Sequence, residues 1–133
     1  MSIEELKRSI TLNAPSTAFS VSQYRMVQQS SSENVFVAGT SVGADTINVG
    51  VLQDAPTIAG EASEIATFGS VTKMVVGSTA LIPGVNYVSG ALGKAITTGT
   101  VGAGQVIYGP WMSAGQSTDS IGFAMFNIVG MTT

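Results

Sequence analysis

Residues 50 to 60 read Gly50-Val51-Leu52-Gln53-Asp54-Ala55-Pro56-Thr57-Ile58-Ala59-Gly60, and the organisation of the chain is clearest from this stretch. It closes a run of alternating apolar residues, turns through Asp54-Ala55-Pro56, and opens a second run at Glu61. The sequence on either side looks like two versions of one β unit, so we expect the stretch to join them. It carries no reactive group, which is a first indication that the chain is not an enzyme.

The composition is that of a folded domain with few charges. The chain has 133 residues, of which 44% are hydrophobic and 10% are charged, and this length suits one domain with a sizeable core. Ordinary soluble domains carry about 25% charged residues. A surface so poor in charge is neutral and in places apolar, so we expect partners to cover much of it. The alternative is a soluble β domain coated with Ser and Thr.

Charge and hydropathy argue against two classes of partner. The net charge is −3 and Lys and Arg total 5, whereas nucleic-acid binding requires a basic patch. No apolar run reaches the roughly 18 residues of a membrane-spanning helix. Cysteine is absent, which fits a reducing compartment. Export through a signal peptide is not expected. A signal peptide needs an apolar segment near the N-terminus, and this chain has charged residues there, namely Glu4, Glu5, Lys7 and Arg8.

The sequence offers little for catalysis or for metal binding. Without His or Cys it lacks the Ser-His and Cys-His nucleophile systems and the common zinc sites. Glu61 and Glu64 would face opposite ways on a strand, so we expect them to be solvated or paired with Lys73 or Lys94. The Gly-rich run at residues 99–104 lacks the Lys-Ser/Thr of a phosphate-binding loop. We therefore predict no catalytic residue, no metal and no cofactor.

Residues 1–20 are expected to form an N-terminal arm. Ser2 to Arg8 has the pattern of one or two helical turns with Ser2 as the N-cap, although so short a helix is marginal alone. We expect the arm to become ordered only against a neighbouring molecule, and a frayed terminus is the alternative. The partner contacts predicted in the arm are Ile3, Leu6, Ile10 and Leu12.

Residues 21–133 have the pattern of a single all-β domain. Apolar alternation and β-branched residues, bounded by Gly and Pro, predict short strands. Helix is the competing interpretation for residues 60–67. Short strands at this spacing indicate a small compact barrel or sandwich. The strands are expected at Val21–Gln28, Val35–Ala38, Thr46–Val51, Ala62–Phe68, Ser70–Gly77, Asn86–Val88, Lys94–Thr98, Gln105–Gly109 and Ile121–Val129.

Three local features are predicted in more detail. In the run at residues 46–51, alternation turns the apolar side chains of Ile47, Val49 and Val51 inward. Pro83-Gly84 has the residue order of a type II turn. Near the C-terminus, the side chains expected in the core are Phe123, Met125 and Phe126.

One segment recurs later in the chain. Residues 42–50, Val-Gly-Ala-Asp-Thr-Ile-Asn-Val-Gly, are echoed at residues 101–109 by Val-Gly-Ala-Gly-Gln-Val-Ile-Tyr-Gly. Each copy reads as a turn, an alternating strand, and a glycine where the strand bends or is approached closely. If the repeat is genuine, two related β units pack face to face and meet near residues 50–60. In a chain rich in Gly, Val and Ala, such an echo can also arise by chance.

Trp111 allows two interpretations. It follows Pro110 and precedes Met112. Because Trp is enriched at interface hot spots, Trp111 and Met112 are possible partner contacts. Packing of this single Trp in the core is the alternative.

Several of these runs together resemble tailed-phage capsid decoration (cement) proteins. Their pattern is a "YR-x-V" strand, a polar turn, an apolar strand, and then "GVLQ-(D/N)-x-P" followed by "AGE". The residues that carry the resemblance are Tyr24-Arg25-Met26-Val27, Val35-Phe36-Val37-Ala38-Gly39, residues 47–56 and Ala59-Gly60-Glu61. Leu81-Ile82-Pro83-Gly84-Val85 and Gly93-Lys94-Ala95 resemble the second half of the pattern. The likeness covers roughly residues 24 to 110, while the long arm and residues 111–120 match nothing in it.

The resemblance implies a small, β-tulip-like fold on the outer surface of an icosahedral head. Such proteins are made in the host cytoplasm and bind the major capsid protein of the virion, which they clamp against internal pressure. They commonly assemble as homotrimers and sometimes as dimers. The alternatives are another phage structural β module, such as a tail or fibre component, and a carbohydrate-binding or hydrolytic β domain. The last of these needs a cleft lined by aromatic side chains and paired carboxylates.

Overall fold

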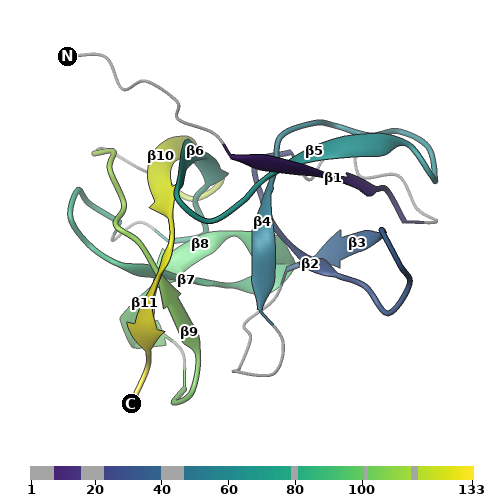
Figure 1. Ribbon diagram of the computed structural model, residues 1–133. Helices are drawn as coiled ribbons and strands as arrows, with labels where there is room; N and C mark the ends of the chain where they lie inside the picture. The colour runs from purple at the N-terminus through teal and green to yellow at the C-terminus, as the bar shows by residue number, and fades with distance from the viewer. Residues whose placement is uncertain (1–7, 16–22, 40–46, 79–80, 101, 115–116) are drawn as a thin grey trace.

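The computed structural model describes residues 8–15, 23–39, 47–78, 81–100, 102–114 and 117–133. Within these ranges the chain forms 11 short strands and two 3-10 turns, and no α-helix. The strand ladders are antiparallel and form three sheets, which do not close into a barrel (Figure 1). The prediction of an all-β chain is therefore confirmed.

The first sheet has five strands, all from the N-terminal half of the chain. Its two edge strands approach each other at one point, where the N–H of Asn13 donates to the carbonyl of Asn34 at 2.7 Å. This single contact curls the sheet without closing it. In spatial order the strands are β1 (Ser9–Asn13), β5 (Ala62–Ala66), β4 (Asn48–Leu52), β2 (Met26–Gln29) and β3 (Phe36–Ala38).

The C-terminal half forms the other two sheets, on the left of Figure 1. One sheet pairs β10 (Ile121–Phe126) with β6 (Ser70–Val75). The other runs in the order β11 (Ile128–Met131), β9 (Val106–Tyr108), β7 (Tyr87–Ser89) and β8 (Ala95–Thr97). The 3-10 turns η1 (Ala91–Gly93) and η2 (Thr98–Thr100) flank β8.

The chain changes sheets after β5, not at residues 50–60. Residues 53–61 connect β4 to β5, which are neighbours in one sheet. At the change of sheet, Gly69 has a φ of +86° and donates its N–H to the carbonyl of Phe126 at 2.8 Å. The stretch quoted first is thus a connection inside one sheet, which differs from the predicted junction between two β units.

Most predicted strands are present, with shifted ends. The strand expected at Val21–Gln28 begins only at Met26, because Tyr24 is in a turn with a φ of 64°. The competing helix at residues 60–67 is absent, and β5 lies there instead. The Pro83-Gly84 turn is confirmed, since Gly84 has a φ of +88° and Val85 donates to Ile82. The turn expected at residues 41–45 lies outside the described residues.

The inward face of β4 differs from simple alternation. Ile47 and Val51 contact one core cluster, whereas Val49 packs against the other. Val27 of β2 pairs with Gly50, and the next residue, Gln28, pairs with Asn48. Val49 is therefore an extra residue in β4. Such a bulge reverses the side-chain alternation of the strand, and the prediction that all three residues share one face is wrong.

Part of the expected arm belongs to the domain. Ser9 to Asn13 form β1, which pairs with β5 of the same chain along its whole length. This differs from the expectation that residues 1–20 become ordered only against a neighbour. The helical turns expected at residues 2–8 and the contacts expected from Ile3 and Leu6 lie outside the described residues, except for Arg8.

Two hydrophobic clusters lie on opposite faces of the first sheet. Neighbouring residues of a strand point to opposite faces, so Met26 and Val51 reach one cluster while Val27 and Leu52 reach the other. The larger cluster joins all three sheets, and the smaller one is enclosed by the curl of the first sheet. The larger cluster comprises Met26, Val51, Met74, Val76, Leu81, Tyr87, Ala95, Val106, Tyr108, Trp111, Ala124 and Phe126.

Gly50 and Gly109, the last residues of the echoed segments, are both approached closely. A Cβ on Gly50 would collide with the carbonyl oxygen of Ala66, and one on Gly109 would collide with the side chain of Asn86. The expectation of a close approach at these glycines is confirmed. Residues 42–46 and 101 lie outside the described residues, and the strands that follow them, β4 and β9, belong to different sheets.

Replacing Gly50 with Ala should destabilise the protein strongly. The new methyl group would overlap backbone of β5, which cannot move without breaking the β4–β5 pairing, so we expect a loss of about 2 kcal/mol or more in unfolding free energy. The control is Gly102→Ala, where a Cβ meets no atom within 4 Å. Urea unfolding measures both variants, and equal stabilities would contradict the close approach.

Candidate functional site

The carboxylates near the β4–β5 connection hold the backbone. The side chain of Asp54 accepts the N–H of Glu64 at 2.6 Å, and that of Glu61 accepts the N–H of Thr57 at 2.8 Å. Within the described ranges, no group of three or more acidic, His or Cys side chains is placed to hold a metal ion. Through these backbone hydrogen bonds, the two carboxylates hold the β4–β5 connection in place, which is a structural role.

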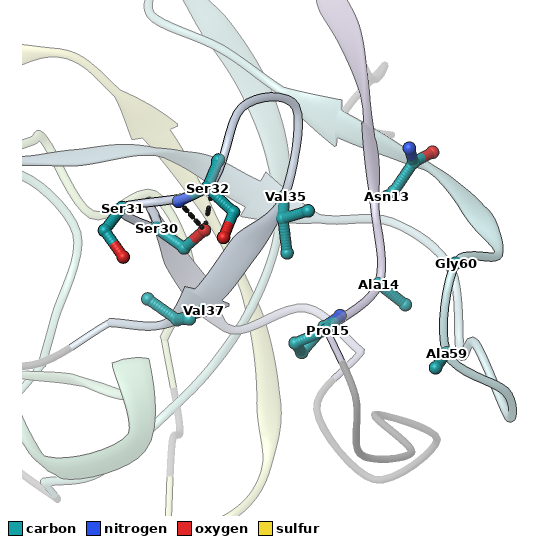
Figure 2. A pocket seen from close by; sticks show the side chains of 10 residues that line it. All are labelled: Asn13, Ala14, Pro15, Ser30, Ser31, Ser32, Val35, Val37, Ala59 and Gly60. Carbon is teal, nitrogen blue, oxygen red and sulfur yellow. Dashed lines mark hydrogen bonds between the residues drawn. The ribbon is translucent and has the colours of Figure 1, made fainter.

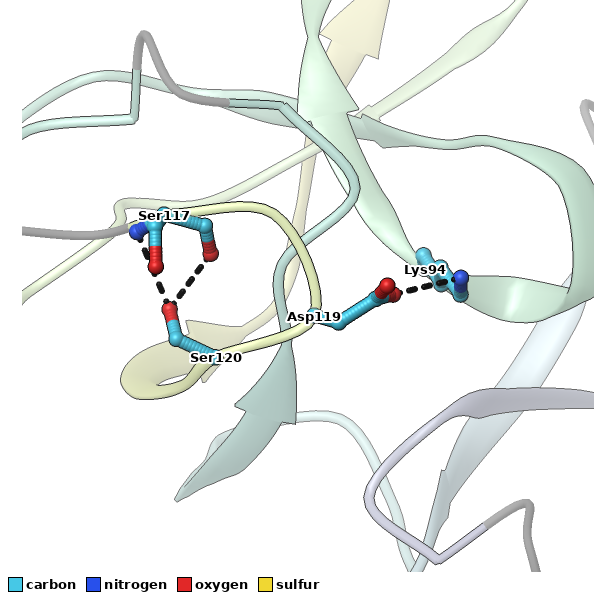
Figure 3. Close-up of polar contacts among 4 residues, drawn as sticks. All are labelled: Lys94, Ser117, Asp119 and Ser120. Atoms are coloured by element: carbon cyan, nitrogen blue, oxygen red, sulfur yellow. Dashed lines mark hydrogen bonds and ion pairs between the residues drawn. The ribbon is translucent and has the colours of Figure 1, made fainter.

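Lys94 pairs with Asp119 and not with Glu61 or Glu64 (Figure 3). Its Nζ lies 2.6 Å from the Asp119 carboxylate, and this hydrogen bond holds the pKa of Asp119 below its ordinary value. Asp119 has a φ of 67° and belongs to a turn in which the Ser120 hydroxyl donates to the carbonyl of Ser117 at 2.6 Å. The ion pair ties this turn to the start of β8.

Lys73 has a different contact from the one expected. Its Nζ lies 5.5 Å from the ring centroid of Tyr24, within the range of a cation–π interaction. This contact links β6 of the second sheet to the turn that precedes β2. The expected pairing of Lys73 with Glu61 or Glu64 is replaced by a contact with an aromatic face.

A surface pocket of about 480 Å³ lies at one end of the first sheet. Figure 2 shows serines on one side of it and the Ala59-Gly60 turn on the other, with Pro15 between them. The Ser30 hydroxyl donates to the backbone carbonyl of Ser32 and accepts the N–H of the same residue. The described residues that line this pocket include no charged or aromatic side chain, so this part of the lining suits a neutral group. Its lining residues are Asn13, Ala14, Pro15, Ser30, Ser31, Ser32, Val35, Val37, Ala59 and Gly60.

Two smaller pockets lie on the C-terminal half. One, of about 390 Å³, is lined by Thr98, Gly99, Ile107 and the last three residues of the chain. The other, of about 300 Å³, lies around Leu92 and Ile96 and includes Lys94. Among the described residues, none of the three pocket linings includes an aromatic or an acidic side chain. The cleft that a glycan-binding or glycan-cleaving domain requires is not found in these pockets.

The predicted partner contacts separate into two groups. Trp111 is completely buried and meets Tyr87 edge-on, with 5.8 Å between the ring centroids. The interpretation of Trp111 as a partner anchor is therefore wrong, and Leu12, 6% exposed in the smaller cluster, is likewise a core residue. Ile10 is 43% exposed and Met112 is half-buried, so these two remain available to a partner.

Two further predictions, one about core side chains and one about a strand, hold only in part. Phe126 is fully buried as expected, whereas Phe123 and Met125 are half-buried, because residues 122, 124 and 126 face the core in β10. The strand predicted at Ile121–Val129 is interrupted at Asn127. Its first part pairs with β6 and its second part, β11, pairs with β9 in another sheet.

Apart from Ile10, the exposed apolar side chains were missed by sequence reasoning. Three of the eight lie on β11, and most of the others lie in turns. In the sequence they look like core residues, and only Asn127 and Gly130 hint that the pattern of β10 does not continue. The eight are Ile10, Ile58, Ile82, Leu92, Ile121, Ile128, Val129 and Met131.

The buried tyrosines are structural groups. The hydroxyl of Tyr87 donates to the carbonyl of Met125 at 2.9 Å, and the hydroxyl of Tyr108 accepts the N–H of Asn48 at 3.2 Å. Burial raises the pKa of Tyr87 well above its ordinary value, with a smaller contribution from Tyr108. Burial also raises the pKa of Tyr108. Neither tyrosine lines any of the three pockets described above, so we relate the raised pKa values to the stability of the fold.

Comparison with known proteins identifies no family. A scan of the chain against protein-family models finds no match, and a search of curated proteins finds no similar sequence. Within the described residues, no helix has the length and apolar character needed to cross a membrane. The function must be inferred from the residues of this chain.

Replacing Tyr87 with Phe should change the response to alkali. At neutral pH the variant loses the bond to Met125, which costs about 1 kcal/mol. In the wild type the folded-state pKa lies above the ordinary value of 10.0, so this phenol's contribution to stability falls as pH rises above about 10. The variant should lose stability less steeply there. Denaturant unfolding from pH 8 to 11 tests this, and parallel curves would contradict it.

Replacing Asp119 with Asn should have a small effect that depends on pH. Asn tolerates the positive φ, so only the ion pair is lost, and a slightly lower Tm is expected at pH 7. Because the folded-state pKa of Asp119 is lowered, its contribution disappears as pH falls through that pKa, and the two proteins should then match. Lys94→Gln should give a similar, non-additive loss. An additive double variant would contradict the pairing.

Proposed function

We propose that this chain is a structural virion protein that binds the outer surface of a phage capsid and cements neighbouring major capsid subunits. The observation that carries the proposal is its surface. Eight large apolar side chains are exposed in the described residues of a chain that is only 10% charged. Apolar surface of this kind is covered in proteins that work as parts of an assembly.

The sequence pattern shared with capsid decoration proteins supports the proposal through its structural roles. Gly50 allows β4 and β5 to approach, and Gln53 donates to the carbonyl of Val51 and to the Thr72 hydroxyl. Gly93, in the second half of the pattern, has a φ of +73°, and a Cβ there would collide with the carbonyl of Met26 in the first half. The two halves of the pattern are therefore in contact.

The arrangement of the sheets fits the same proposal. The first sheet packs across the larger cluster onto the other two, and this is the basis for describing the fold as a β-tulip-like sandwich. The exposed apolar residues lie on β11, in turns, and singly on β1 and β10. A shell of repeated subunits can be clamped by several such small contacts, because their combined avidity exceeds that of any one of them.

The proposal is tested by adding the purified chain to expanded heads that lack it, from the phage whose genome encodes it. We expect the amount that sediments with the heads to saturate in proportion to the major capsid subunits, and we expect the heads to resist heating better. Cryo-EM of the particles then locates the chain. Density at one vertex would favour a tail or fibre component, and no binding to heads would overturn the proposal.

A further inference from the structure

β11 is an edge strand whose outer side has no partner in the described part of the chain. Every other sheet edge there meets further backbone at one point at least. β1 and β3 meet each other, β6 and β8 meet beyond the end of β6, and β10 meets the segment before it. The bridges are Asn13 with Val35, Val76 with Ala95, and Trp111 with Ala124. β11 and the C-terminus lie at the lower left of Figure 1, away from the first sheet.

The exposed edge is short and contains a bulge, but it lacks two other usual protections against pairing. Proteins commonly protect edge strands with charged residues or Pro. β11 has neither, and its Ile128, Val129 and Met131 are 42%, 49% and 45% exposed. No charged side chain occurs after Asp119, and none belongs to any strand of this four-stranded sheet. An edge that is apolar, uncharged and unpaired is suited to receive another strand.

We propose that β11 pairs antiparallel with the β11 of a second copy of this chain about a twofold axis. Addition to a different edge would require a second open edge, whereas the other described edges are already engaged. Self-pairing requires only β11. In an antiparallel pair about a twofold axis, residues equally far from the axis on either side lie opposite each other, so no residue of β11 would face a charged side chain. The resulting sheet would be continuous across the two copies.

The bulge at Val129 limits the length of the new ladder. The pairing with β9 shifts between Ile128 and Gly130, and the ladder continues beyond the bulge to Thr132, which donates to Gln105 at 2.9 Å. Specific interfaces bury about 1,200 Å² or more, which so short a strand does not supply alone. The adjoining pocket, where Ile107 and Met131 meet, supplies further uncharged surface. A weak dimer that depends on concentration is expected.

This inference specifies the self-association that the proposed function calls for, and in that sense it rests on that proposal. Light scattering of the free full-length chain over a concentration series tests it without any capsid. The wild type should approach twice the 13.5 kDa mass of one chain. Val129→Lys should stay at the monomer mass, because each copy would bring a charge into the middle of a short apolar ladder. Ile82→Lys, an equally exposed site on a turn, should dimerise like the wild type.

Single cysteines provide a second readout, because the chain has none of its own. Of single cysteines introduced at Ile128, Val129 and Met131, the one nearest the twofold axis should cross-link two copies most readily on oxidation, and Cys at Ile82 should not cross-link. These variants decide the question if Val129→Lys fails to fold by circular dichroism. A monomeric wild type, a trimer that Val129→Lys leaves intact, or equal cross-linking at Ile82 would overturn β11 pairing. Heads that bind a monomeric chain would separate this failure from that of the proposed function.

Discussion

A row of five aromatic rings joins the two C-terminal sheets to the segment that follows β5, and the rest of the structure depends on it. Phe68 stacks on Phe126 with 4.9 Å between centroids, Phe126 on Tyr108 at 5.0 Å, and Tyr108 on Tyr87 at 6.0 Å, while Trp111 meets Tyr87 edge-on. Offset and edge-to-face pairs contribute about 0.5 to 1.5 kcal/mol each beyond the burial of their surface. None of the sheets can bury its inner face alone, so this row makes the chain one unit.

The first sheet is attached to that row mainly through backbone. Asn48 of β4 donates its N–H to the Tyr108 hydroxyl, and Val75 of β6 donates to the carbonyl of Tyr24. Gly93 lets the 3-10 turn η1 lie directly against β2 at Met26. Backbone contacts of this kind tolerate little change in side-chain size. They explain why glycine is required at Gly93, where a Cβ would collide with the carbonyl of Met26.

Local patterns predicted the strands, and long-range contacts decided the rest. Alternation identifies β6, and β-branched residues identify β3, because these signals lie within the strand itself. The bulge in β4, the break at Asn127 and the change of sheet after β5 depend on which strands become neighbours. Burial is ambiguous for the same reason. From its sequence context Trp111 could be a partner contact or a core residue, and only its long-range contacts place it in the core.

The distribution of covered and uncovered edges links the fold to assembly. A chain with few charges cannot rely on repulsion to keep its strands from pairing with other molecules. In the described residues, the sheet edges other than β11 are each protected by a backbone bridge. These bridges bring strands together at single residues such as Asn13 and Val76. Because that protection is built from geometry, it can be left out at one place without affecting the others. β11 has no such bridge in the described residues, so its exposed apolar side chains lie on an edge strand that can still pair.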